Sequence, residues 1–277
     1  MKSYKPFLLS GVLLAGAAAF LAIPAAFAQG QQAASPQAAA DPAKVAALPI
    51  PVNEIIRRFA QHESEFKVER DNYTYTQEVL VQEPDGGEYR RISDIVFTPA
   101  GKRYEKDTFF PVPTLQQISM SSQDLADLEN IQPFVLTTDQ LPKYDIQFVD
   151  TEKVDELDTY VFRVTPKRME KNQRYFQGMV WVDDHDLAVV KSDGKAVPDL
   201  KDNLFPRFVT YRENIEGGFW FPTYTRADDI LHFQSGDVRM RMTVRYKNYK
   251  RFGSTIKIGE SKPVENSPAN PQQPPQK

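Results

Sequence analysis

Residues 237–252, DVRMRMTVRYKNYKRF, alternate between apolar and polar side chains. Successive side chains of a β-strand point to opposite faces, so the stretch separates by parity into two rows. One row holds the apolar Val238, Met240, Met242, Val244 and Tyr246, and the other holds Arg239, Arg241, Thr243, Arg245 and Lys247. The alternation predicts a strand with one buried face and one solvent-facing, basic face.

The basic row does not by itself indicate a nucleic-acid site. The chain carries 34 Lys and Arg against 37 Asp and Glu, a formal net charge of −3. Nucleic-acid binding draws most of its affinity from a basic field, which this composition does not supply. We therefore interpret the arginines as the solvent-exposed face of a sheet and expect no nucleic-acid partner.

The N-terminal residues 1–28 have the pattern of a secretory signal peptide. Lys2 and Lys5 precede an apolar stretch that ends with Ala26 and Ala28, the small residues that a signal peptidase requires. We expect export to the periplasm with cleavage after Ala28. Residues 29–50 and 259–277, poor in large apolar side chains, are expected to be a disordered linker and a disordered Pro-rich tail.

The absence of cysteine limits the chemistry of the folded part, residues 51–258. The chain has no cysteine, which excludes disulfides, thiolate ligands, a cysteine nucleophile and acylation at an N-terminal cysteine. The fold must be held by its hydrophobic core alone, and 41% hydrophobic residues suffice for one domain of this length. We find no internal repeat.

Most of the folded part has the pattern of antiparallel strands. A helix capped by Asn53 is predicted first, with Ile55, Ile56, Phe59 and Phe66 on one stripe. A hairpin follows, then an irregular region between residues 100 and 143. In this region a capping box of Ser121 and Asp124 predicts the start of a short helix that contains Leu125 and Leu128. From Tyr144 the strands return, joined by short turns that include Asp193-Gly194.

About nine strands in sequential order predict a mainly β (α+β) fold. A meander this wide curls, and the two helices are the available cover for its concave face. The expected result is a half-open barrel around an apolar cavity, which suits a lipid.

The residues 176–195, FQGMVWVDDHDLAVVKSDGK, and 205–252, from FPRFVTYREN to YKNYKRF, resemble the outer-membrane lipoprotein-sorting proteins. The similarity lies in the VWVD strand, the G-x-W-F-P strand and the last strand, and it extends over about residues 51–253. It implies a LolA-like fold, in which helices cover a curved sheet. Proteins with this fold carry or sense lipoprotein acyl chains. It implies no catalytic residue.

The sequence therefore predicts a non-enzymatic periplasmic carrier without cofactor or metal. Its expected partners are acyl chains of lipids or lipoproteins, an inner-membrane donor and an outer-membrane acceptor. The candidate cavity-lining residues are Ile55, Phe59, Tyr73, Tyr75, Val79, Phe162, Val180, Val182, Phe219, Phe221, Val238, Met240, Met242 and Val244.

Two alternatives stay open. One is an envelope interaction or sensor module with a fully packed core. The other is a hydrolase at Asp183–Asp186, where three carboxylates and an imidazole gather, although a turn between strands attracts aspartate for backbone reasons.

Overall fold

The computed structural model describes residues 41–98, 101–131, 133–200, 203–215 and 218–251, all within one unit of the chain. The predicted signal peptide, the start of the predicted linker and the predicted tail lie outside these ranges and stay predictions. The described strands are β1 Tyr73–Gln82, β2 Glu88–Phe97, β3 Arg103–Phe109, β4 Tyr144–Val154, β5 Leu157–Pro166, β6 Tyr175–Asp183, β7 Val189–Val197, β8 Phe208–Ile215, β9 Phe219–Phe233 and β10 Gly236–Arg251.

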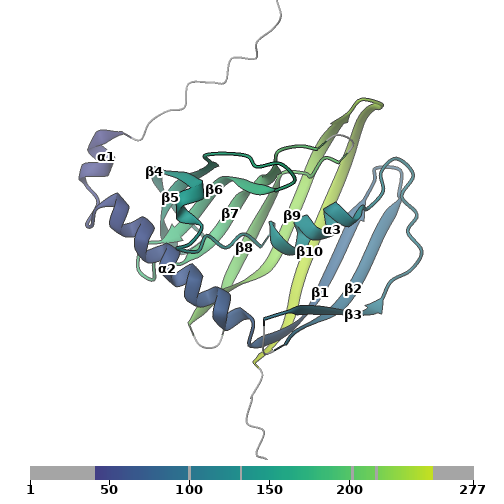
Figure 1. The fold of residues 1–277 in the computed structure, drawn as a ribbon, viewed down its shortest axis with the longest axis horizontal. Helices are drawn as coiled ribbons and strands as arrows, with labels where there is room; N and C mark the ends of the chain where they lie inside the picture. The colour runs from purple at the N-terminus through teal and green to yellow at the C-terminus, as the bar shows by residue number, and fades with distance from the viewer. Residues whose placement is uncertain (1–40, 99–100, 132, 201–202, 216–217, 252–277) are drawn as a thin grey trace, which may run out of the picture. The chain divides into compact units, whose positions relative to one another are not determined.

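These strands form one antiparallel sheet in the order β3-β2-β1-β10-β9-β8-β7-β6-β5-β4 (Figure 1). Two meanders, β1 to β3 and β4 to β10, join where β1 pairs with β10. The sheet stays open, with β3 and β4 at its edges. The predicted mainly β architecture is confirmed, and the curved sheet does not close into a barrel.

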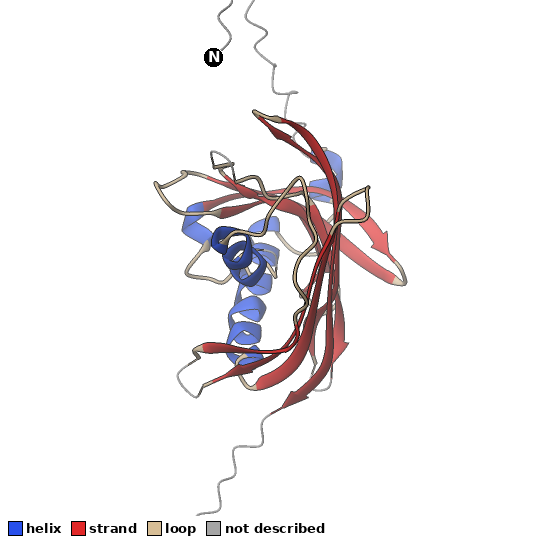
Figure 2. Cartoon of the chain, turned by 90° about the vertical axis from the view of Figure 1, so that its right-hand side faces the viewer, coloured by secondary structure: helices blue, strands red, loops and turns tan. Residues whose placement is uncertain are grey.

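Two helices cover the concave face of the sheet, α2 Val52–Arg70 and α3 Ser122–Asn130 (Figure 2). Helix α2 buries Ile55, Phe59 and Phe66, as its stripe predicts. The cap assigned to Asn53 is wrong, because α2 begins at Val52 with Pro51 as its N-cap. The fixed φ of proline suits the residue that leads into a helix. None of the described helices is long and apolar enough to cross a membrane.

The strand β10 has the two faces that its alternation predicts. Val238, Met240, Met242, Val244 and Tyr246 are buried. The arginines of the other row are exposed, and Arg239 and Arg241 approach Asp228 of β9 at 3.0 and 3.3 Å. The basic row is therefore a solvated outer face with its own acidic partner.

Three local features differ from the sequence-based expectation. Strand β3 lies in the region predicted to be irregular; it is an edge strand with mostly exposed side chains, so it has no alternation to detect. Residues 42–46 of the predicted linker form α1, Pro42–Ala46, and Leu48 and Ile50 pack against the core. The short 3-10 helix η1, Leu141–Lys143, leads into β4.

The turn predicted at Asp193-Gly194 is wrong, because Gly194 lies inside β7, opposite Gly178 of β6. A Cβ on Gly194 would lie 2.7 Å from the ring of Phe176. This glycine makes room for an aromatic ring and does not form a turn.

Candidate functional site

The predicted cavity-lining residues lie on the covered side of the sheet, and most of them are in its main core cluster. That cluster holds Ile55, Phe59, Val79, Phe162, Val180, Val182, Met240, Met242 and Val244, with Tyr75 partly buried against it. Tyr73 and Phe221 pack with Phe66 in a second cluster that Phe219 borders, and Val238 is buried near the start of β10. Some of the predicted cavity-lining residues therefore belong to the packed core, and others line a cavity.

The space beneath α2 is filled by side chains. The rings of Phe59 and Phe162 lie 5.4 Å apart between α2 and β5, and those of Phe66 and Phe221 lie 5.2 Å apart between α2 and β9. Ile55, Phe59, Phe162 and Phe221 have no exposed surface. These four side chains are therefore part of the packed core.

A different segment covers the apolar row of β10. Residues 110–121, here called the strap, run from β3 to α3, and Ile118 and Met120 of the strap pack against the core. Met240 and Met242 line a cavity together with Ile118 and Met120 of the strap.

A buried carboxylate fastens the strap to the sheet. Glu83, just after β1, accepts hydrogen bonds from the backbone N–H groups of Gln116, Gln117 and Ile118 at 2.8, 2.7 and 2.9 Å. Thr114 adds a backbone hydrogen bond of 2.8 Å to the carbonyl of Glu88. Hydrogen bonds to an ionised acceptor are among the strongest in proteins, so Glu83 holds the middle of the strap in place.

Polar contacts anchor α3, which continues the strap. The predicted capping box of Ser121 and Asp124 is present, and the Nδ2 of Asn203 donates to Ser121 Oγ at 2.8 Å and to Asp124 Oδ1 at 3.1 Å. One turn further on, Asp127 pairs with Arg174 at 2.9 Å, with both side chains buried. The lid formed by the strap and α3 is thus held by hydrogen bonds and an ion pair as well as by Leu128.

Two cavities share strap residues 118–120 as part of their walls, and together they are here called the apolar groove. The first has a volume of about 210 Å³, and its apolar walls are Val81, Ile118, Met120, Leu204, Phe205, Leu231, Phe233, Met240 and Met242. The first cavity also has polar lining residues, among them Gln117, Asp124 and Asn203. The second has a volume of about 420 Å³, and its walls include Tyr89, Phe110, Pro113, Leu115, Ile118, Met120 and Leu125. The second volume falls within the range typical of small-molecule sites, and the first lies below that range.

Sequence reasoning found two residues of this groove, Met240 and Met242, and missed its other wall. Ile118 and Met120 lie in a region without periodicity, so nothing in the pattern assigns them to a face. Leu231 occupies the same face of the neighbouring strand, opposite Val238. The signal available in the sequence was the presence of large apolar residues in a segment with too many prolines to be a central strand.

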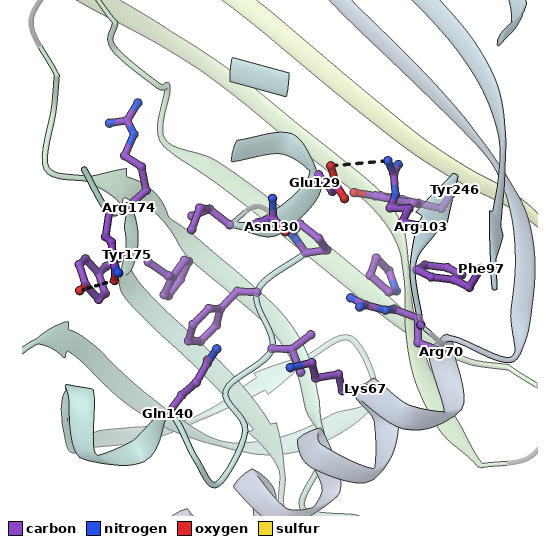
Figure 3. Close-up of a pocket in the computed structure, with 18 of the residues that line it drawn as sticks. Lys67, Arg70, Phe97, Arg103, Glu129, Asn130, Gln140, Arg174, Tyr175 and Tyr246 are labelled. Carbon is purple, nitrogen blue, oxygen red and sulfur yellow. Dashed lines mark hydrogen bonds and ion pairs between the residues drawn. The ribbon is translucent and has the colours of Figure 1, made fainter. Parts of the chain in front are cut away.

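A third cavity of about 410 Å³ lies where α2 and α3 end (Figure 3). Its walls carry Lys67, Arg70, Arg103, Lys143 and Arg174, with Glu129 as the acidic lining residue. Tyr75, predicted as a lining residue, borders this cavity together with Tyr246 and Tyr249. We call it the basic pocket.

The acidic turn is the hairpin turn predicted between β6 and β7. Asp183, His185 and Asp186 have potential ligand atoms within 4.8 Å of one another. However, the buried Asp183 carboxylate already accepts the backbone N–H groups of His185 and Asp186, at 3.1 and 2.6 Å. Its geometry is explained by closing the turn.

No protein-family model matches the chain, and no curated protein matches it. Several solved structures are similar to it, among them the following three. A LolA superfamily protein, NE2245 from Nitrosomonas europaea, is 17% identical over 73% of this chain and 94% of that chain, with a TM-score of 0.38. A DUF1329 family protein from Desulfovibrio piger is 16% identical over 70% and 91%, with a TM-score of 0.36. MucB of Pseudomonas aeruginosa, in its complex with MucA, is 12% identical over 70% and 93%, with a TM-score of 0.22.

Proposed function

We propose that this protein is a non-catalytic carrier or binding protein that holds an acyl chain in the apolar groove. The observation that supports this proposal is the hollow between the strap and β10, lined by Met240, Met242, Ile118, Met120 and Phe205. Each methylene that leaves water there contributes about 0.8 kcal/mol, so a long chain supplies ample binding free energy. Methionine suits such a wall because its flexible thioether adapts to irregular apolar shapes.

Movement of the strap is the proposed route of entry and release. Ile118, Ser119 and Met120 line both cavities of the groove, so displacing them would join the cavities and expose the groove. Loop movements of this kind control ligand exchange in many binding sites. An inner-membrane donor and an outer-membrane acceptor in the periplasm are the proposed partners, in line with the signal-peptide pattern of residues 1–28.

A pair of substitutions on β10 tests the acyl site. Met242 and Val244 lie on the same face of one strand, but Met242 borders the apolar groove, whereas Val244 is fully buried in the core. We expect Met242→Glu to keep the fold, because the carboxylate can share a cavity with water, and to weaken binding of a fluorescent fatty-acyl probe at least tenfold. Val244→Glu buries an unpaired charge and should unfold the domain.

Binding is followed by probe fluorescence and folding by circular dichroism. Equal unfolding by both variants would show that Met242 lies in packed core. A wild-type protein that neither binds the probe nor yields lipid on extraction would overturn the acyl proposal.

An interaction module is the second candidate, and one surface favours it. Beside β3, at the edge of the sheet, Phe109, Phe110 and Val112 are exposed, and Val112 retains 87% of its surface. Exposed apolar residues of this kind are typical of protein contact sites. If the probe does not bind, loss of a partner on Val112→Asp would support this second function.

A further inference from the structure

The basic pocket is lined by five Lys and Arg side chains and one acidic side chain, Glu129. Two of its cations already have acidic partners: Arg103 pairs with Glu105 and lies 3.9 Å from Glu129, and Arg174 pairs with Asp127. Figure 3 shows Arg174 on the far side of the pocket from Arg103. These two arginines hold β3 and α3 in place and are assigned no other role.

The remaining three cations are Lys67, Arg70 and Lys143. Within the described ranges, Lys67 and Lys143 form no ion pair. Asp139 lies near both, and its pKa is lowered mainly by a hydrogen bond from Thr137 and further by these two lysines. Two exposed ammonium groups therefore share the charge of one carboxylate.

Arg70 is the most constrained of the three. Among the described residues its only acidic contact is Asp71 Oδ1 at 3.5 Å. Its guanidinium lies 5.6 Å from the centre of the Phe97 ring, and its side chain is 23% exposed. Its Nε–H is buried without a hydrogen-bond partner among the described residues, as are the Nε–H of Arg174 and the Oδ1 of Asp71. Buried donors are nearly always satisfied, so this guanidinium N–H is available to an acceptor that enters the pocket.

We propose that the basic pocket binds an anionic phosphate group, with Arg70 as the main contact and Lys67 and Lys143 as supporting charges. The planar guanidinium matches the oxygens of a phosphate, and the lysines add point charges from α2 and η1. Figure 3 shows Lys67 and Arg70 extending from α2 into the pocket. A volume of about 410 Å³ exceeds a bare phosphate, so the pocket has room for a larger molecule that bears this group.

This site is distinct from the apolar groove. The groove borders Ser121 and Asp124 at the start of α3, whereas the basic pocket borders Glu129 and Asn130 at its end. Either site can therefore exist without the other, and the two proposals can fail separately.

Calorimetric titrations at low ionic strength test the proposal with three probes: dodecyl phosphate, dodecanol and inorganic phosphate. We expect Arg70→Gln to weaken binding of dodecyl phosphate at least tenfold and to leave binding of dodecanol unchanged, because only the phosphate can accept charge-assisted hydrogen bonds from the guanidinium. Arg245→Gln removes the same charge from the exposed outer face and should leave all three titrations unchanged.

If Arg70→Gln fails to fold, Lys67→Gln and Lys143→Gln test the pocket instead, because both positions are exposed. Each of these variants should weaken phosphate binding severalfold. Binding of inorganic phosphate that depends on Arg70 would indicate a free phosphate ligand; dependence seen with dodecyl phosphate alone would indicate a lipid headgroup. The proposal is overturned if neither dodecyl phosphate nor inorganic phosphate binds to the wild-type protein. It is also overturned if both probes bind to the Arg70, Lys67 and Lys143 variants as tightly as to the wild-type protein. Failure of dodecanol to bind would contradict the acyl proposal and leave the phosphate proposal standing.

Discussion

The buried pair of Glu63 and Arg212 joins three parts of the molecule through two side chains. Arg212 Nη1 lies 2.8 Å from Glu63 Oε1, and the two side chains are 2% and 3% exposed. The guanidinium also donates to the carbonyl of Phe134 and lies over the ring of Phe66. Helix α2, strand β8 and the segment after α3 therefore meet at one guanidinium.

Removing one member of this pair should cost more than removing both. Arg212→Met leaves the Glu63 carboxylate buried without its partner, and we expect a loss of about 3–5 kcal/mol in the free energy of unfolding. Replacing both side chains, with Glu63→Leu added, should recover a large part of this loss. Urea denaturation of the two single variants and the double variant measures the coupling, and additive losses would contradict it.

Single residues also show which features a local sequence pattern can predict and which it cannot. The parity of residues 238–247 gave the correct face for these ten side chains of β10 because the strand pattern is local. It fails beyond them, where Tyr249 has the parity of the basic row but packs against the core. The partner of Glu63 lies 149 residues away, and no pattern near either residue indicates the contact. Gly194 was misassigned because a glycine that accommodates the Phe176 ring and a glycine in a turn look alike in a sequence.

At the scale of elements, the strap is the part that sets access to the apolar groove. It has no regular structure of its own, and the Glu83 carboxylate holds it by three backbone N–H groups. Glu83→Gln keeps the shape but offers one acceptor oxygen to three donors, and it removes the charge. We expect the local opening free energy of residues 116–118 to fall by about 1–3 kcal/mol.

Hydrogen exchange followed by mass spectrometry or NMR measures this change as faster exchange at residues 116–118. Exchange of the acyl probe should become faster in the same variant. Glu156→Gln, at an exposed position in the turn between β4 and β5, is the matched control and should change neither rate. Unchanged protection of residues 116–118 in Glu83→Gln would show that Glu83 does not fasten the strap.

The elements differ in how far the sequence predicts them. Helix α3 was predicted from its capping box and apolar residues, and β10 from its alternation, because both signals are local. Strand β3 was missed because an exposed edge strand has no buried face. The strap resembles an ordinary loop, and its role arises only from the hydrogen bonds to Glu83.

At the scale of the whole described unit, the concave face is divided into a filled part and a hollow part. Beneath α2 the rings of Phe59, Phe162 and Phe221 fill the space. Beneath the strap and around α3 the face keeps the apolar groove and the basic pocket. The sequence predicted the apolar face as a whole but not this division, because the positions of α2, α3 and the strap decide which inward side chains meet a cavity.

The most direct test of the central claim is to locate a bound acyl chain on the protein. A fatty acid with a photoreactive diazirine near the end of its chain is irradiated with the full-length protein, and the modified residues are mapped by mass spectrometry. We predict labelling on both walls of the apolar groove, at residues 118–120 of the strap and 240–242 of β10. Labels scattered over exposed residues, with none in these two segments, would contradict the account.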